Sequence, residues 1–192
     1  EIAVYTSKGP KVSADELRQM HQPLDALGLN FYAAAAVKKG ANGKPEVVPE
    51  PPGHPRSGFD WTITPDGLYW AVRLHHERYG LPIVITENGL SSLDWVAEDG
   101  RVHDPQRIDY LHRHLLQLHK AIEDGTQVEG YFQWSLLDNF EWAEGYRERF
   151  GLIYIDYPTL KRIPKDSFYW YQEVIRTNGA NLGQIGELAS AR

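Results

Sequence analysis

Some segments of the chain have the apolar spacing of a buried strand, and others have the apolar spacing of an amphipathic helix. Residues 83–85 are three consecutive β-branched apolar residues, followed by a threonine, Glu87 and the turn-forming pair Asn88-Gly89. A short apolar run without polar alternation predicts a strand that is buried on both faces. Pro82 is tolerated at the first position of this strand, and Glu87 stands where the strand meets its loop.

Helical spacing occurs on both sides of this strand. Thr64-Pro65 predicts the start of a helix that runs to about Tyr79, and Asp104-Pro105 predicts the start of a second helix that closes at Gly125. Apolar residues recur in both segments every three or four positions, which is typical of helices that pack one face on a core. These faces are predicted to hold Leu68, Val72 and Tyr79 in the first helix and Ile108, Leu111, Leu115, Leu118 and Ile122 in the second.

Weaker signals mark the remaining elements. A capping box at Ser13 and Glu16 predicts a short helix that stops before Pro23. The prolines concentrated in the second half of residues 33–60 predict a long loop without regular structure. The other predicted elements are strands at 27–32, 128–134 and 150–155, a last helix at 164–177, and a loose tail at about 179–192.

The predicted order alternates helices with strands, which implies right-handed crossovers and a parallel sheet. Three parallel strands leave two unpaired edges, whereas a closed barrel of this kind needs eight strands and about 250 residues. We therefore predict an α/β fold that forms the last three strand–helix units of a (β/α)8 TIM barrel and is incomplete on its own. Residues 1–192 are expected to be a single carboxyl-terminal segment of one barrel domain.

Composition narrows the classes of function. A formal net charge of −6 argues against nucleic-acid binding, because no basic surface would offset it. The sequence has no apolar run long enough for a membrane span and no charged-then-apolar leader, and it contains no cysteine. We expect no membrane association and a cytoplasmic location. Six Trp and eleven Tyr provide many flat rings of the kind that stack on sugars, although such rings also fill cores.

Polar and aromatic residues gather where the predicted strands end. Asn30 and Tyr32 end the first strand, Glu87 the second and Trp134 the third. Because the carboxyl ends of parallel strands meet on one face of a barrel, these side chains are expected to share a site. The loop after the third strand adds Asp138, Asn139, Glu141, Trp142 and Phe150. Carboxylate, amide, hydroxyl and indole groups together suit a neutral, polyhydroxylated ligand.

Four motifs resemble those of the family-1 glycoside hydrolases, which are typified by β-glucosidases. Residues 85–89 (ITENG) resemble the nucleophile signature of the family, and residues 134–142 (WSLLDNFEW) resemble its sugar-binding segment. Residues 145–152 continue that segment, and residues 30–32 (NFY) resemble the usual Asn-Tyr-Tyr. The resemblance extends over residues 12–178, with the motifs in the family's order and spacing. It implies a TIM barrel that hydrolyses β-linked glycosides with retention of configuration.

The resemblance also implies a role for each catalytic residue. Glu87 would attack the anomeric carbon and form a covalent glycosyl-enzyme. Tyr32 matches the tyrosine whose hydroxyl contacts the nucleophile and favours its charged form. Asn30 would support the same region.

The remaining matched residues would bind the substrate, a β-glucoside or a cello-oligosaccharide. Trp134 would stack under the sugar in the first subsite, and Glu141 would bind the hydroxyls at C4 and C6. Trp142 would bind the hydroxyl at C3, and Phe150 would close the wall of the subsite.

The sequence departs from the family pattern in one missing motif and in a few replaced residues. A retaining enzyme needs a second carboxyl group about 5–5.5 Å from the first, which acts as acid and then as base. In this family that group lies in an Asn-Glu-Pro motif, and no Asn-Glu-Pro occurs in this chain. We therefore expect a complementary amino-terminal barrel segment as partner. Phe31 replaces a commoner tyrosine, and the small residues 33–36 are less polar than the family pattern.

Other interpretations compete with this one. A 6-phospho-β-glycosidase would need groups that suit a phosphate, and the carboxylate of Glu141 would repel one. A non-catalytic half-barrel that binds sugar is the second alternative. Trp134, Trp142 and Tyr32 could be core residues, whereas Asp138 and Asn139 are expected to brace their loop rather than touch substrate.

The eight histidines raise the question of a metal site. His75 and His76 are adjacent on a helix and point about 100° apart, so they cannot share one ion. His112 and His119 lie two turns apart at the edge of an apolar stripe. No metal and no cofactor is predicted. The aromatic residues 168–171 are interpreted as the face with which the last helix packs on the barrel.

Overall fold

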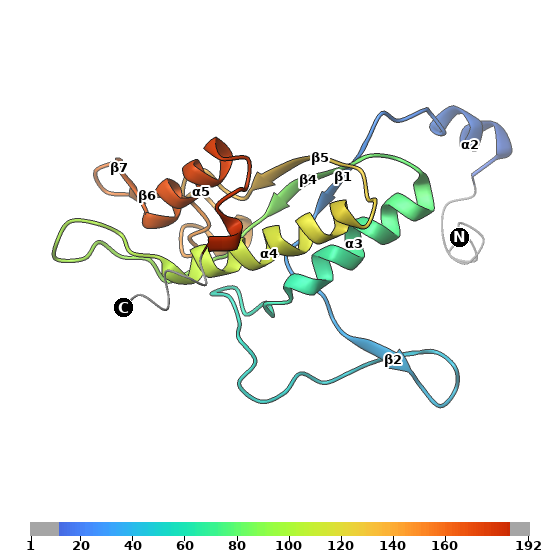
Figure 1. The fold of residues 1–192 in the computed structure, drawn as a ribbon, viewed down its shortest axis with the longest axis horizontal. Coiled ribbons are helices and arrows are strands. Elements are labelled where there is room, and N and C mark those ends of the chain that lie inside the picture. The colour runs from blue at the N-terminus through green and yellow to red at the C-terminus, as the bar shows by residue number, and fades with distance from the viewer. Residues whose placement is uncertain (1–11, 185–192) are drawn as a thin grey trace.

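Three parallel strands form the centre of the structure, a computed structural model that describes residues 12–184. β4 lies between β1 and β5, and the helices α3 and α4 make the two connections and lie against one face of the sheet (Figure 1). The bounds of these elements are β1 (Leu27–Asn30), α3 (Pro65–Tyr79), β4 (Ile83–Asn88), α4 (Pro105–Glu123) and β5 (Val128–Gln133). The predicted parallel α/β arrangement is confirmed, with strand ends close to those expected.

The core lies between β4 and the two helices. Ile83 and Ile85 of β4 are fully buried, and they belong to one apolar cluster with Leu68 and Val72 of α3 and with Leu115 and Leu118 of α4. The opposite face of the strand is different, because Thr86 is exposed. The prediction that β4 is buried on both faces is therefore wrong. Three strands cannot close around an interior of their own, so the second face lacks the cover that a complete barrel would give it.

The helix ends follow the predicted signals. α3 begins at Pro65 and ends before Gly80, which has a φ of 64°. Thr64 does not cap the helix with its side chain; its hydroxyl instead accepts a hydrogen bond of 2.8 Å from the Ala34 N–H. Two residues predicted on apolar faces are exposed, Tyr79 by 52% and Ile122 by 46%, and both stand in the last turns of their helices.

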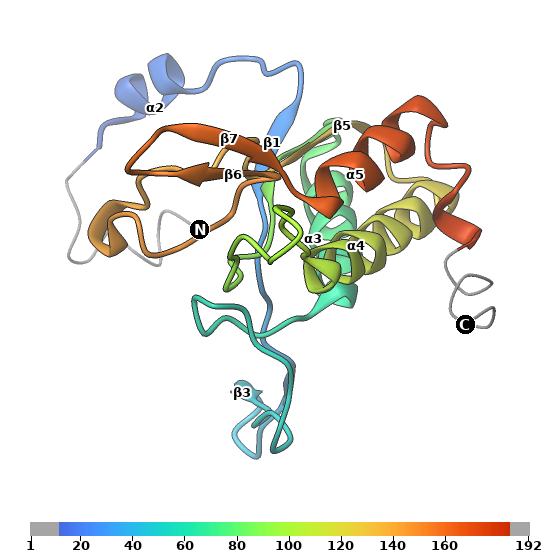
Figure 2. The same cartoon turned by 90° about the vertical axis from the view of Figure 1, so that its left-hand side faces the viewer.

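The segment before α3 contains more structure than predicted. α2 (Ala14–Met20) has the expected capping box. Within the predicted loop, β2 (Val37–Lys39) and β3 (Pro45–Val47) pair as an antiparallel hairpin that projects from the body (Figures 1 and 2). The prediction of a loop without regular structure is therefore wrong for these strands. Pro45 is tolerated because it occupies the first position of an edge strand, where no N–H is needed.

The carboxyl-terminal part adds a hairpin and a helix. The predicted strand at 150–155 begins later, as β6, and pairs with β7, which was not predicted. The last helix, α5, is confirmed within the predicted range, and η2 follows it. The bounds are η1 (Trp142–Glu144), β6 (Ile153–Asp156), β7 (Lys161–Pro164), α5 (Asp166–Arg176) and η2 (Leu182–Gln184).

The predicted tail is ordered in its first part. Leu182 packs against the main apolar cluster, and its carbonyl oxygen lies 2.7 Å from His112 Nε2. The prediction of a loose tail from residue 179 is therefore corrected for residues 179–184, and residues 185–192 lie outside the described residues. Within residues 12–184 no helix combines the length and the apolar character needed to cross a membrane.

Candidate active site

Glu87 and Tyr32 face each other at the carboxyl end of the sheet. The Tyr32 hydroxyl donates a hydrogen bond of 2.6 Å to Glu87 Oε2, and the Phe31 N–H donates one of 2.9 Å to the Glu87 carbonyl oxygen. Burial raises the pKa of Tyr32, and its hydrogen bond with Glu87 and the charge of that carboxylate raise it further. The hydroxyl therefore stays protonated at neutral pH and remains a donor to the carboxylate.

Trp134 and Glu141 lie on the same end of the sheet. The Trp134 N–H donates a hydrogen bond of 2.9 Å to the carbonyl oxygen of Asn88, so the ends of β4 and β5 are joined directly. Burial raises the pKa of Glu141, a hydrogen bond with the Trp134 side chain opposes this effect, and the charge of Glu87 adds to it. The charge of Glu141 also acts on Tyr32. Four of the predicted site residues thus influence one another across a single site.

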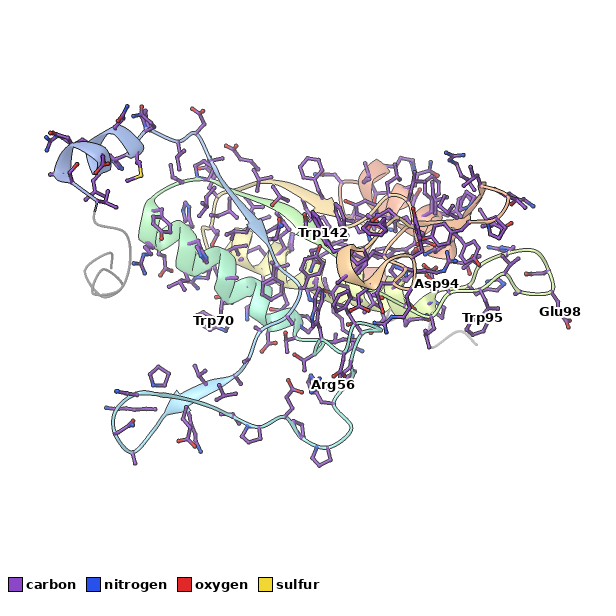
Figure 3. The ribbon with its side chains drawn as sticks, turned by 180° about the vertical axis from the view of Figure 1, so that it is seen from behind. Arg56, Trp70, Asp94, Trp95, Glu98 and Trp142 are labelled. Atoms are coloured by element: carbon purple, nitrogen blue, oxygen red, sulfur yellow. The ribbon has the colours of Figure 1, made fainter. Side chains whose placement is uncertain are left out.

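The other three predicted residues take different positions. Asn30 accepts a hydrogen bond of 2.6 Å from the Thr86 hydroxyl on the exposed face of the sheet. Trp142, labelled in Figure 3, is 82% exposed. Phe150 is only 3% exposed, and its ring lies edge-on to Tyr32 with 6.0 Å between centroids. The ring of Phe150 therefore shows almost no surface in this chain, and its predicted place on the wall of a subsite stays a prediction.

Two aromatic residues that the sequence did not single out complete the packing around Tyr32. Trp61 lies against Tyr32 with 4.9 Å between ring centroids, and Phe59 stacks on Trp61 at 4.4 Å. Both follow the proline-rich segment, and their position directly after it was the one available signal. With Phe150 they form a group of rings in contact with Tyr32.

Gly89 allows the strand ends to come this close together. A Cβ atom at Gly89 would lie 1.8 Å from the carbonyl oxygen of Trp134, a distance that no side chain can occupy. The sequence predicted a turn at this position, and the structure adds a second requirement, which is room for the neighbouring backbone. The peptide bond that follows, Trp134–Ser135, is cis.

A buried network of six charged side chains fixes the loops around the site. Arg107 Nη2 and Lys165 Nζ bind the same oxygen of Asp94, at 2.7 and 2.5 Å. Lys165 also lies 2.9 Å from Asp138, which accepts a further hydrogen bond of 2.6 Å from Arg149. The sixth member, Asp104, binds Arg107 and the N–H of Ser167. Three carboxylates therefore balance three cations.

This network ties together four segments of the chain. Asp94 turns inward from the loop after β4, whereas its neighbour Trp95 is 69% exposed (Figure 3). The prediction that Asp138 and Asn139 brace their loop is confirmed, because the Asn139 side-chain amide donates hydrogen bonds of 3.0 Å to the Ser135 hydroxyl and to the Leu137 carbonyl. The loop that carries Glu141 is therefore held at its base by charges.

No cation site is evident in the part of the chain that the structure describes. Residues 12–184 contain no group of three or more His, Asp or Glu side chains arranged to hold a metal ion. Several histidines of this part of the chain donate to backbone carbonyls: for example, His75 Nδ1 donates to the Ala71 carbonyl at 2.7 Å, and His112 Nε2 donates to the Leu182 carbonyl at 2.7 Å.

Comparison with known proteins agrees with this fold. The Glycosyl hydrolase family 1 profile matches residues 2–180. Beta-glucosidase A of Thermotoga maritima is 47% identical over 171 residues, which are 88% of this chain and 38% of that protein. An aryl-phospho-beta-D-glucosidase of Bacillus subtilis is 50% identical over 131 residues, covering 66% of this chain and 27% of that protein. A solved beta-glucosidase from Thermotoga maritima in complex with glucoimidazole superposes with a TM-score of 0.78 at 48% identity, covering 86% of this chain and 37% of that one.

These matches define the class of protein. The chain belongs to glycosyl hydrolase family 1. Its parallel sheet and helices are part of a TIM barrel, and the chain spans less than two-fifths of the length of the beta-glucosidase it matches.

Proposed function

We propose that this chain carries the nucleophile of a retaining β-glucosidase, which hydrolyses terminal β-D-glucosyl residues. The observation that carries the proposal is the 2.6 Å hydrogen bond from the Tyr32 hydroxyl to Glu87 Oε2 at the end of β4. A hydrogen bond from a hydroxyl group holds a carboxylate oxygen in one orientation, which a nucleophile needs. Membership of the family and the similarity to a beta-glucosidase support the choice of reaction.

The reaction would proceed in two steps. In the first, a carboxylate oxygen of Glu87 forms a bond to the anomeric carbon, while the glycosidic oxygen leaves with the bonding electrons and takes a proton from an acid. In the second, water loses a proton to the same group, now a base, and displaces Glu87 from the sugar. The sequence lacks the Asn-Glu-Pro motif with which the family supplies this acid, so we place the acid in a complementary amino-terminal barrel segment.

The substrate would be a β-glucoside or a cello-oligosaccharide. Glu141 is half-buried beside Trp134, a pairing that suits a carboxylate accepting hydrogen bonds from adjacent hydroxyls while an indole covers the face of the ring. Asn30 and the exposed Trp142 would add polar contacts. Phe150 would close the wall of the subsite beside Tyr32.

A covalent trap tests the nucleophile directly. 2-Deoxy-2-fluoro-β-glucosyl fluoride needs no acid, because fluoride leaves without a proton, so the missing half of the mechanism is bypassed. We expect the peptide that carries Glu87 to gain the mass of one fluoroglucosyl group, and Glu87→Gln to abolish this gain. Glu141→Gln is the matched control, since it removes a carboxylate from the same site and should slow labelling without moving it. Labelling of another residue, or equal labelling of Glu87→Gln, contradicts the assignment.

A mixing experiment tests whether the nucleophile and the acid lie on two different segments of the barrel. We expect this chain alone to release no nitrophenol from an aryl β-glucoside, because the proton donor is missing. Hydrolysis should appear when the amino-terminal barrel segment is added, and native mass spectrometry should then show the 21.9 kDa chain in a complex. Turnover by the purified chain alone would overturn the proposal that the acid lies elsewhere.

The similarity to an aryl-phospho-beta-D-glucosidase keeps a 6-phospho-β-glycosidase as the second candidate. Glu141 weighs against it, because its carboxylate would meet a dianionic phosphate at the same end of the site. Rates of trapping by the fluoroglucosyl reagent and by its 6-phosphate separate the two, and a preference for the phosphate would reverse our choice. A half-barrel that binds sugar without catalysis would retain sugar affinity but show no trapping.

A further inference from the structure

The side chain of Asn88, the residue after Glu87, is fully buried, and both its amide nitrogen and its amide oxygen are hydrogen-bonded. Asn88, at the end of β4, is 0% exposed. Its amide nitrogen donates hydrogen bonds of 2.8 Å to the Phe31 carbonyl and 3.0 Å to the Tyr110 hydroxyl, and its amide oxygen accepts one of 2.7 Å from the Tyr131 hydroxyl. One side chain therefore connects β4 with β5, with α4 and with the segment that follows β1.

Tyr110 continues this chain of hydrogen bonds to Tyr32. Its hydroxyl accepts from Asn88 and donates a bond of 3.1 Å to the Tyr32 carbonyl oxygen. Tyr32 and Phe31 lie beyond the end of β1, so their carbonyl groups have no strand partner there. The carbonyls of two successive residues are held by Asn88 and Tyr110 instead, which fixes the backbone from which the Tyr32 side chain projects.

We propose that Asn88 and Tyr110 are positioning residues, which set the backbone of Tyr32 so that its hydroxyl meets Glu87; the proposal rests on the nucleophile role of Glu87. Neither residue is proposed to touch the substrate. The directions of the bonds are mutually consistent, since each hydroxyl donates once and the amide uses both its nitrogen and its oxygen. A fully satisfied buried network of this kind defines one geometry, because any rotation leaves a polar group without a partner.

The surroundings of Tyr110 leave it little freedom. The ring is 2% exposed and lies against the His114 imidazole, with 3.9 Å between ring centroids. Burial raises the pKa of Tyr110 and of Tyr131 above the ordinary value, so both hydroxyls keep their protons at neutral pH. The directions of these hydrogen bonds are therefore fixed at neutral pH.

Substituting Tyr110 by Phe tests the proposal, because it removes one hydroxyl and keeps the ring. The first readout is the proton NMR signal of the Tyr32 hydroxyl in the full chain, shifted downfield by its short bond to a carboxylate and assigned by its loss in Tyr32→Phe. We expect this signal to move upfield or to broaden in Tyr110→Phe. The matched control is Tyr69→Phe, which removes a hydroxyl in a partly buried hydrogen bond of 2.6 Å to Asp124, at the other end of α4. This control should leave the Tyr32 signal unchanged.

The second readout is the rate of trapping by 2-deoxy-2-fluoro-β-glucosyl fluoride. We expect Tyr110→Phe to lower the maximal trapping rate about tenfold, with a half-saturating concentration within about twofold of the original, since a misplaced nucleophile slows bond formation without weakening sugar binding. Tyr69→Phe should change neither value.

These measurements test the positioning role of Asn88 and Tyr110 separately from the proposed function. If Tyr110→Phe does not fold, Tyr131→Phe takes its place, because it removes only the bond to the Asn88 amide oxygen. A Tyr32 signal that is unchanged in the folded variant overturns the positioning role, whatever the trapping shows. If the unaltered chain is not trapped at Glu87, the proposed function fails, while the NMR comparison still decides whether Asn88 and Tyr110 position Tyr32.

Discussion

Replacing Asp138 with Asn is expected to lower the free energy of unfolding by about 3–5 kcal/mol, the range measured when one partner of a buried ion pair is removed. Asp138 accepts hydrogen bonds from Lys165 and Arg149 and from the backbone N–H groups of Gly151 and Ile155. Asn keeps the shape but loses the charge, and its NH2 group must face donors. The Lys165 ammonium, whose side chain is 0% exposed, is then left with Asp94 alone.

The cost arises because Lys165 depends on its partners to stay charged. Burial lowers the pKa of Lys165, the neighbouring Arg107 lowers it further, and the carboxylates of Asp138 and Asp94 oppose both effects. Without Asp138, the ammonium group must either remain charged beside one carboxylate or release its proton. Both alternatives destabilise the folded state.

Urea denaturation of the original chain and of Asp138→Asn measures the difference in their free energies of unfolding. The matched control is Asp109→Asn, which removes the same charge from a pair with Arg113 whose side chains are more than half exposed. That variant should lose less than about 0.5 kcal/mol. Combining Asp138→Asn with Lys165→Met should cost less than the sum of the single changes, because the two groups interact. A cost for Asp138→Asn no greater than that of the control would mean that the network does not hold the loops.

The sequence predicted those features that depend on neighbours in the chain. The ends of α3 follow from Pro65 and Gly80, and the strand before Glu87 follows from its β-branched residues. The pairing of Tyr32 with Glu87 came from the resemblance to a family, since 55 residues separate them and no local pattern relates them. In the structure the Tyr32 hydroxyl lies 2.6 Å from Glu87 Oε2.

What the sequence could not predict depends on contacts between distant segments. Lys165 and Asp94 are 71 residues apart, and nothing in the sequence around either residue distinguishes it from an ordinary charged residue on the surface. Phe150 was assigned to the wall of a subsite by its motif, and nothing in the sequence showed that Trp61 and Tyr32 pack against its ring. The exposed second face of β4 has a related cause. An apolar run shows that a strand can be covered on both faces, but the segment that would cover the second face has to be supplied.

His114 gives the second large effect, a loss of stability in acid. Its ring is fully buried on α4, Nδ1 donates a hydrogen bond of 2.7 Å to the Tyr110 carbonyl, and Nε2 has no partner among the described residues. Burial lowers the pKa of His114 to about 4, although the bond to Tyr110 and the charge of Asp66 work in the opposite direction. A proton on Nε2 would therefore be a buried charge without a hydrogen-bond partner among the described residues.

The sign of the effect follows from the two pKa values. The unfolded chain binds a proton on this imidazole below about pH 6.5, whereas the folded chain does so only below about pH 4. The contribution of neutral His114 is thus fully present above the higher value and is lost as the pH falls toward the lower one. A difference of this size corresponds to about 3 kcal/mol.

His114→Phe isolates this contribution, because it keeps a ring of similar size and removes the titration. Unfolding by urea at a series of pH values should show that the stability of the original chain, relative to His114→Phe, falls by about 3 kcal/mol between neutral pH and pH 4. The control His119→Gln changes an exposed histidine of the same helix and keeps His114, so it should retain the acid-dependent loss. If the difference between the original chain and His114→Phe is the same at every pH, then His114 is not held neutral by burial, and water must reach Nε2.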